Sequence, residues 1–583
     1  MRKKLFGLNF LAAFLMLVMV SGCSLPVTQV SPSFSLRNHY AKWQLTLTPA
    51  QKATASPTTK ETVIPSDVQN TITPKATDGA DTLLFMHPGL PASLRNEQAI
   101  PNITLTESQL NADIQFLISG KESSPTSLPS STWVYALVAP FYTLADAASM
   151  DDVIALWQGG IVDNLSFSQI KLTSENYAIM DAIFGEPRGA SVEIVDQETL
   201  DKQALTNQPF ISILPFEELT PRWKVLRIDG QSPIDTEFSP KNYPLKVQIW
   251  VDNKSGYQLS PLPETNYNSD KRTVLLMTGV TALVRATANR MDLQGNTFPG
   301  TDVYPWFSAA DLVHISNEVS FSENCPQPDP FQQDLIFCSS PDRIELLDYV
   351  SANIIELSGN HLLDYGEQAA RLTLEMYAER GWLTYAGGWD LIDAKTPVKV
   401  SHNGNQLAFI GCNLIGPPVA WAGDSSPGAA ACGDYHWLID EIRNLRSEGY
   451  LPIVTLQYKE DYSAYPNPQM EIDFKQIADA GALIVNGSQA HTPKSMIFHE
   501  ESFLHFGLGN LFFDQMEVYY NDTLMEGTRE GFIDRLVFYD GQLISIELLT
   551  TMLEDYARPR PMLAGERQAL LSRTFQIALD SYR

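Results

Sequence analysis

Four side chains of this sequence have the chemistry of ligands for a divalent metal. They are a carboxylate, an amide and two imidazoles: Glu318, Asn360, His361 and His491. Nitrogen and oxygen donors of this kind hold divalent ions in proteins. The set therefore predicts a metal site, provided that the fold brings the four residues together.

Short apolar runs that predict buried strands precede these residues. The runs are residues 311–315, 352–357 and 482–485. Because the carboxyl ends of parallel strands meet at one edge of a sheet, we expect the four side chains to converge there. Other polar residues in the same region are expected to support the site: Arg285, Asp364, Glu460 and Asn510.

Structural roles explain the same residues without a metal. His361 could cap the helix that the sequence predicts over residues 367–380, and Asn360 suits any tight turn. Taken by itself, His491 would be interpreted as a structural histidine that makes its hydrogen bonds within the core. No Ser-His-Asp arrangement or Gly-x-Ser-x-Gly turn is visible, so no catalytic residue is assigned.

The order of motifs over residues 273–515 resembles the capsule synthesis protein CapA family, whose relatives are the calcineurin-like metallophosphoesterases. The positions that agree with the family pattern are Arg285, Glu318, Asn360, His361, Asp364, Gly366, Thr373, Glu460, Gln469, Gly481, Gly487, His491 and Leu508-Gly509-Asn510. The resemblance implies a four-layer α/β/β/α sandwich, placed at residues 271–560, with its site along one edge. A helical tail is expected over residues 561–583.

Three departures from that pattern weaken the expected metal site. Val280 stands where the family has aspartate, and Gln457 and Gln489 stand where it has histidine. A hydrolytic centre with two metals about 3.5–4 Å apart needs a bridging carboxylate and enough ligands for both ions. The departures predict a degenerate site that leaves room for one divalent metal, of unknown identity, at Glu318, His361 and His491.

The preceding part of the chain, residues 81–260, alternates short strands with helices and is predicted to be a smaller α/β domain. It resembles a lobe of the type II periplasmic solute-binding proteins. The matching phrases are Val138 to Phe141, Leu156 to Gly159, Val225 to Gly230, and Tyr243-Pro244-Leu245. The resemblance implies either a site for a small anion or a structural relic without a ligand.

The first residues predict an exported lipoprotein. Three basic residues precede an apolar run over residues 5–20, which ends in Ser21-Gly22-Cys23. A single membrane anchor is the alternative, although the run is short for a helix that needs about 20 residues to span a bilayer. We expect a signal peptide over residues 1–23, lipidation at Cys23, a Ser/Thr/Pro-rich tether over residues 24–80, and an extracytoplasmic protein anchored to the cell membrane.

The net charge argues against one class of partner, and the cysteine content predicts disulfide bonds. A net charge of −28 argues against a nucleic-acid partner, because phosphates would be repelled. The even number of cysteines after Cys23 predicts two disulfides in an exported chain, Cys325–Cys338 and Cys412–Cys432. Zinc ligation and free buried thiols are the alternatives, but no Cys-x-x-Cys spacing supports zinc.

Together these features predict a surface-anchored lipoprotein of the CapA type. It would act in the synthesis, export or anchoring of a capsule or of poly-γ-glutamate, in contact with the polymer or its synthesis machinery. Two alternatives stay open: an active metallophosphoesterase-like hydrolase, and a solute-binding or scaffold lipoprotein. Whether the chain is an enzyme is not decided by its sequence.

Overall fold

The computed structural model describes residues 82–91, 94–95, 103–118, 131–160, 162, 166–257, 259, 262–520 and 523–582. The predicted signal peptide, Cys23 and the whole predicted tether lie outside these ranges. Residues 79–583 form one compact unit. Within the described ranges, no helix combines the length and the hydropathy that crossing a bilayer requires.

The first half of this unit is built on a nine-stranded mixed sheet. Its order is β2 (Ile103–Leu105), β1 (Thr82–Met86), β3 (Ile114–Ile118), β11 (Lys246–Asn253), β4 (Ser131–Pro140), β8 (Phe210–Pro215), β6 (Gln169–Leu172) and β7 (Val192–Ile194), and β9 (Trp223–Val225) also pairs with β4. The helices are α2 (Met150–Trp157), α3 (Ser174–Phe184) and α4 (Gln197–Gln203). Ser149 caps α2, because its Oγ accepts a hydrogen bond from the Asp152 amide at 3.1 Å.

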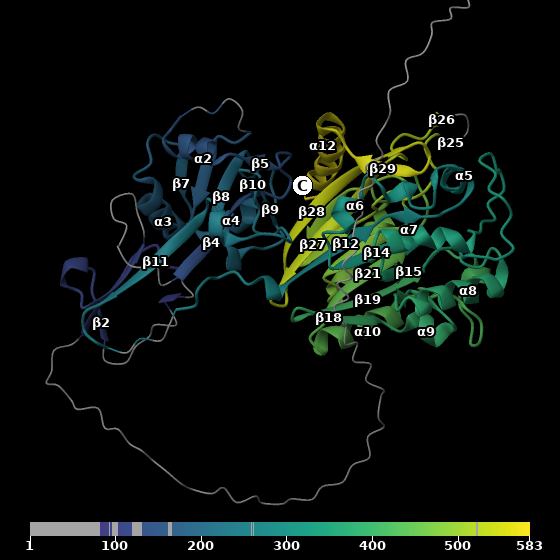
Figure 1. Cartoon of the computed structure of the whole chain (residues 1–583), viewed down its shortest axis with the longest axis horizontal. Helices are drawn as coiled ribbons and strands as arrows, with labels where there is room; N and C mark the ends of the chain where they lie inside the picture. The colour runs from purple at the N-terminus through teal and green to yellow at the C-terminus, as the bar shows by residue number, and fades with distance from the viewer. Residues whose placement is uncertain are drawn as a thin grey trace, which may run out of the picture. The chain divides into compact units, whose positions relative to one another are not determined.

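The second half contains two large sheets (Figure 1). One has the order β16 (Leu383–Tyr385), β15 (Ile354–Glu356), β14 (Leu312–Asn317), β12 (Arg272–Thr278), β27 (Glu530–Tyr539), β28 (Gln542–Glu554) and β29 (Arg558–Pro561), with β13 (Val280–Thr281) paired to β14. The other has the order β18 (Val398–His402), β19 (Asn405–Asn413), β21 (Leu451–Gln457), β22 (Ile484–Ser488), β24 (Ser502–His505) and β23 (Met496–His499). The central strands of both sheets that lead to the predicted site are parallel.

Helices cover the outer face of each sheet, so the second half has four layers. A core that includes Leu347 and Ile355 joins the first sheet to α5 (Arg285–Gln294), α7 (Glu345–Tyr349) and α8 (Gly366–Glu379). A larger core joins the two sheets to each other and to α10 (His436–Ser447) and α11 (Pro468–Asp479). The predicted α/β/β/α sandwich is therefore confirmed.

A helix occupies most of the region where a helical tail was expected, and it packs against residues of the first half. The helix is α12 (Ala564–Ser581). Phe141 and Tyr142, which follow β4, belong to the larger core of the second half. Their rings lie 6.3 and 5.3 Å from the ring of Phe575 on α12. The two halves thus share buried apolar contacts.

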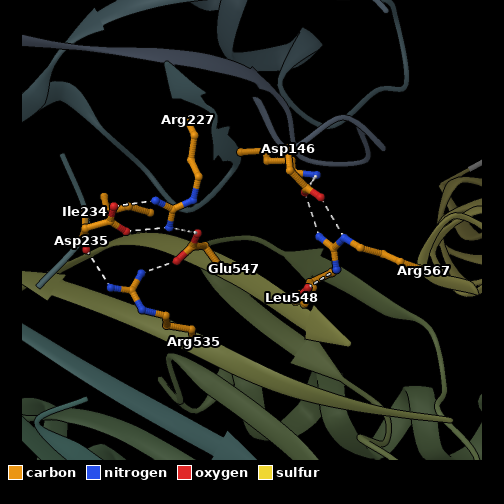
Figure 2. Close-up of polar contacts among 9 residues, drawn as sticks. Asp146, Arg227, Ile234, Asp235, Arg535, Glu547, Leu548 and Arg567 are labelled. Atoms are coloured by element: carbon orange, nitrogen blue, oxygen red, sulfur yellow. Dashed lines mark hydrogen bonds and ion pairs between the residues drawn. The ribbon is translucent and has the colours of Figure 1, made fainter. Parts of the chain in front are cut away.

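Charged side chains reinforce this contact (Figure 2). Arg567 of α12 donates two hydrogen bonds to Asp146, from Nε at 2.9 Å and from Nη2 at 2.8 Å. Nearby, Arg227 donates two to Asp235, at 2.5 and 2.7 Å, and Arg535 of β27 pairs with Glu547 of β28. The first half is linked to the β27–β28 hairpin by Arg535, which also donates to the carbonyl of Ile234 at 2.8 Å, and by Arg227, which lies 4.0 Å from the Glu547 carboxylate.

Both predicted disulfides are present. Cys325 is bonded to Cys338, and Cys412, at the end of β19, is bonded to Cys432. The second bond closes a loop of 20 residues that contains Gly416 and Trp421, and both of these residues contact the site described below.

Candidate functional site

The predicted residues lie where strand ends of two sheets meet, whereas the sequence suggested the edge of one sheet. Ser316, near the end of β14, has its Oγ 3.2 Å from the Oγ of Ser488 at the end of β22. Asn413, at the end of β19, donates a hydrogen bond of 2.7 Å to the carbonyl of Ser358, which follows β15. The packing of one sheet on the other therefore builds the site.

Glycine at position 359 allows the loop after β15 to approach Glu318. A Cβ atom at this position would lie 2.8 Å from Cα and 3.1 Å from Cγ of Glu318, closer than nonbonded carbons approach. The side chain of Glu318 thus packs against the residue that precedes Asn360. Glu318 is only 5% exposed.

His361 is held by Asp364. Nδ1 of the imidazole lies 2.7 Å from Oδ2 of Asp364, and the ring packs at 4.8 Å against Phe337. Burial alone would lower the pKa of His361, but the hydrogen bond to Asp364 and the charges of Glu318 and Glu460 outweigh it, so the pKa is raised above its usual 6.5. Asp364, which the sequence analysis expected to support the site, thus orients the imidazole of His361.

The raised pKa predicts a pH-dependent contribution of this pair to stability. Because the folded protein binds the proton of His361 more tightly than the unfolded chain does, the contribution is complete below about pH 6.5 and is lost as pH rises through the folded pKa. We expect Asp364→Asn to cost about 1–2 kcal/mol at pH 6 and clearly less at pH 9. Urea unfolding at the two pH values measures the difference. Asp434→Asn, in the exposed pair with His436, serves as the control and should show no such change.

His491 is oriented in a similar way. Its Nδ1 lies 2.8 Å from Oδ1 of Asn510, whose amide nitrogen donates to the carbonyl of Thr528 at 3.1 Å. On the other side of the ring, Nε2 lies 3.9 Å from Oε1 of Glu460. Asn510 and Glu460 therefore both lie against His491.

Arg285 serves the site indirectly. Its guanidinium donates to the two carboxylate oxygens of Asp514 at 3.2 and 2.5 Å, and it lies 5.1 Å from the rings of Phe337 and Phe513. Because Phe337 packs on His361 and Phe513 on His491, Arg285 supports both imidazoles through their neighbours. Asp514 was not singled out from the sequence, where nothing connects it with an arginine 229 residues earlier.

Primary amides occupy the centre of the site. Gln457, at the end of β21, donates from Nε2 to Oδ1 of Asn360 at 2.8 Å and to Oε1 of Gln489 at 2.5 Å. Its own Oε1 accepts from Nδ2 of Asn413 at 2.5 Å. We call these four residues the amide chain. The sequence marked Gln457 and Gln489 only as departures from a pattern, and it gave no sign that Asn413 would join them.

This arrangement does not fit a two-metal centre. Each amide oxygen of the amide chain accepts a hydrogen bond from another group of the protein. All four oxygens are therefore already engaged within the protein and do not point together at a metal position. Val280 adds only an aliphatic side chain, which is buried. In the part of the chain that the structure describes, no group of three or more His, Cys, Asp or Glu side chains is placed to hold a metal ion. A single metal at Glu318, His361 and His491 stays a prediction.

In the first half, the helix starts are unsuited to anions. The first turns of α2, α3 and α4 carry acidic residues, namely Asp151 and Asp152, Glu175, and Glu198. These carboxylates complement the positive end of each helix dipole, which would otherwise attract an anion. The small-anion site therefore gains no support from these helices and stays a prediction.

Comparisons with known proteins agree with the motif order. Residues 274–515 match the family described as "Bacterial capsule synthesis protein PGA_cap". The "PGA biosynthesis protein CapA" of Bacillus subtilis (strain 168) is 24% identical over 216 residues, which cover 36% of this chain and 56% of that protein. The "Capsule biosynthesis protein CapA" of Bacillus anthracis is 22% identical over 258 residues, which cover 43% and 62%. The chain thus spans little more than half the length of these relatives.

Solved structures align with part of this chain. A hypothetical protein from Thermus thermophilus aligns over 48% of this chain and 100% of its own, with 13% identity and a TM-score of 0.31. An ABC-type phosphate transport receptor from Vibrio cholerae aligns over 30% of this chain and 88% of its own, with 9% identity and a TM-score of 0.25. Alignments at this level carry no argument about ligands or activity.

Proposed function

Residues 274–515 belong to the bacterial capsule synthesis protein family, and on this premise we propose that the chain is a lipid-anchored accessory protein for an envelope polymer. It would act outside the cytoplasm in the synthesis, export or anchoring of a capsule or a poly-γ-glutamate-like polymer. Lipidation at Cys23 would fix it to the membrane, and residues 24–80 would let the folded part reach the polymer or its synthesis machinery.

We further propose that the site binds without metal-dependent hydrolysis. The observation that carries this proposal is the position of Gln457, because its amide joins the loop after β15 to the loop after β22. Neutral amides that are hydrogen-bonded to one another are poor ligands for a pair of hydrolytic metals. A polymer-handling role needs recognition and does not need that chemistry.

One feature favours a second candidate, a site for a single metal. His361 and His491 each have Nδ1 against an oxygen acceptor, so a metal would have to bind at Nε2, which in His491 lies 3.9 Å from the Glu460 carboxylate. Histidines that ligate metals are commonly oriented in this way by an outer carboxylate or amide. Metal analysis distinguishes this single-metal site from a site without metal.

Metal content separates the candidates. We expect the purified chain to hold much less than one equivalent of any transition metal by mass spectrometry, and His361→Ala to leave that content unchanged. We also expect no turnover of a phosphodiester such as bis-p-nitrophenyl phosphate above that of a His436→Ala control, since His436 is exposed and outside the site. Two stoichiometric metals together with turnover would establish the hydrolase instead, and one equivalent lost in His361→Ala would establish the single-metal site.

A deletion strain tests the cellular role. Loss of the gene should reduce the amount of polymer on the cell surface, and the wild-type gene should restore it. Cys23→Ser should restore it poorly, because the unlipidated chain would not be retained at the membrane. An unchanged polymer content in the deletion strain would contradict the proposal.

A further inference from the structure

The orientation of every amide in the amide chain is fixed from one end. Oδ1 of Asn413 accepts from the Gly416 amide at 2.6 Å and from the Trp421 indole at 3.1 Å. Both of these groups can only donate, so the oxygen of Asn413 must face them and its nitrogen must face the other way. That nitrogen donates to the carbonyl of Ser358 and to Oε1 of Gln457.

The orientation of Asn413 determines which atoms donate and which accept in the other three residues of the amide chain. With its oxygen engaged by Asn413, Gln457 presents its nitrogen to the oxygens of Asn360 and Gln489. The amino groups of Asn360 and Gln489 then form the two ends, and neither donates to any residue in the described part of the chain. A nitrogen that makes no hydrogen bond here would count as an unpaired buried atom if it were fully buried, and neither of these two does. Solvent or a ligand can therefore reach both.

Burial and backbone conformation indicate that these two donors are held in place. The side chains of Asn413 and Gln457 are fully buried, and Gln489 is 5% exposed. Gln489 also has a φ of +64°, a left-handed conformation that residues with a Cβ seldom adopt. Such conformations persist where the surrounding contacts enforce them, and they are frequent at binding sites.

A carboxylate lies against the loop that carries Asn360. Glu318 packs against Gly359, which precedes Asn360, and within the described ranges its carboxylate accepts no hydrogen bond. Two N–H donors and one carboxylate together have the hydrogen-bonding groups that a secondary amide needs, since it offers one carbonyl oxygen and one N–H. The carboxylates of Glu318 and Glu460, together with the net charge of −28, disfavour a densely anionic chain.

We propose that Asn360, Gln489 and Glu318 bind the acetamido group of a neutral N-acetylated glycan without a metal. Asn360 and Gln489 would donate to the carbonyl oxygen, and Glu318 would accept the N–H. The half-buried indole of Trp421, whose Nε1 holds Asn413, offers a ring beside the amide chain against which a sugar could pack. This inference rests on the proposed envelope-polymer function and names the chemistry that its site would recognise.

Calorimetric titration of the full chain in detergent and EDTA tests the wild type first. We expect tri-N-acetylchitotriose to bind, and glucose oligomers of the same length, which lack the acetamido group, to bind at least tenfold more weakly. A γ-linked glutamate pentamer should also bind at least tenfold more weakly. Tighter binding of the glutamate pentamer would overturn the proposal in favour of an anionic amide polymer. Absence of chitotriose binding at millimolar concentration would also overturn it.

Two nearly isosteric variants then test the donors. Asn360→Asp and Gln489→Glu keep the oxygen that accepts from Gln457 but replace the outward amino group by a second oxygen. Each should weaken chitotriose binding at least tenfold, whereas Gln568→Glu, which adds the same charge on an exposed part of α12, should not. Folded variants that bind like the wild type would overturn the proposal. A surface-polymer defect in the deletion strain without chitotriose binding would reject this inference and leave the proposed function standing.

Discussion

Gly279→Ala is expected to lower the free energy of unfolding by about 3 kcal/mol or more, because a Cβ there meets backbone atoms that cannot move. The added carbon would lie 2.1 Å from the carbonyl oxygen of Gly509 and 2.9 Å from its carbon. Val280 donates its amide hydrogen bond to that same oxygen at 3.0 Å. Moving the segment away would break this bond between β13 and the loop before Asn510.

The backbone at Gly509 cannot move away to make room for a Cβ at position 279. Its φ is +77°, and its own missing Cβ would lie 2.7 Å from the carbonyl oxygen of Glu530. Urea unfolding of the purified variant measures the loss. Gly565→Ala is the matched control, since nothing lies within 4 Å of its Cβ position and alanine is favoured over glycine in a helix such as α12 by up to about 1 kcal/mol. Equal stability of the two variants would contradict the predicted steric overlap.

Asp146→Asn is expected to cost about 2–3 kcal/mol at pH 7. The carboxylate accepts two hydrogen bonds from Arg567 and lies 2.7 Å from Nζ of Lys224, which is largely buried. Removing its charge leaves Lys224 without its ion pair, and breaking such pairs when buried costs about 3–5 kcal/mol. We expect less than that range because half of the Asp146 side chain is exposed to solvent.

The pH dependence of this effect has a defined sign. Burial alone would raise the pKa of Asp146, but Arg567 and Lys224 outweigh it and lower the pKa to about 2. The stabilisation is therefore present above the usual pKa near 3.8 and is lost as pH falls toward 2. The difference between wild type and variant should shrink as pH drops below about 4 in urea unfolding. Glu198→Gln is the control, because its pair with Lys202 is exposed on both sides and should contribute less than about 1 kcal/mol.

Features that depend on neighbours along the chain could be predicted from the sequence. The apolar runs at 311–315, 352–357 and 482–485 became parts of β14, β15 and β22, and each ends next to the expected polar residues. The disulfide pairs were also correct, because cysteines 13 and 20 residues apart were assigned to local bonds. The resemblance of motif order added the four layers, which composition and periodicity alone did not give.

Features that depend on the packing of one sheet on the other could not be predicted. Gln457 reaches Asn360 across 97 residues of sequence, and the sequence showed only that a histidine was missing there. The role of that glutamine as a donor to two other amides requires the positions of β15, β21 and β22 in space. In the same way, Arg285 was recognised as a supporting residue while its partner Asp514 was not.

The position of Phe141 and Tyr142 has a consequence for how the protein can be divided. The polar segment at 266–270 looks like a boundary between two domains, yet these two aromatic side chains belong to the apolar core of the second half. A fragment that ended before the boundary would carry both rings uncovered into water, and the remaining fragment would lack part of its interior. We therefore expect the two halves to unfold together, because they share one compact unit and one apolar core across that boundary.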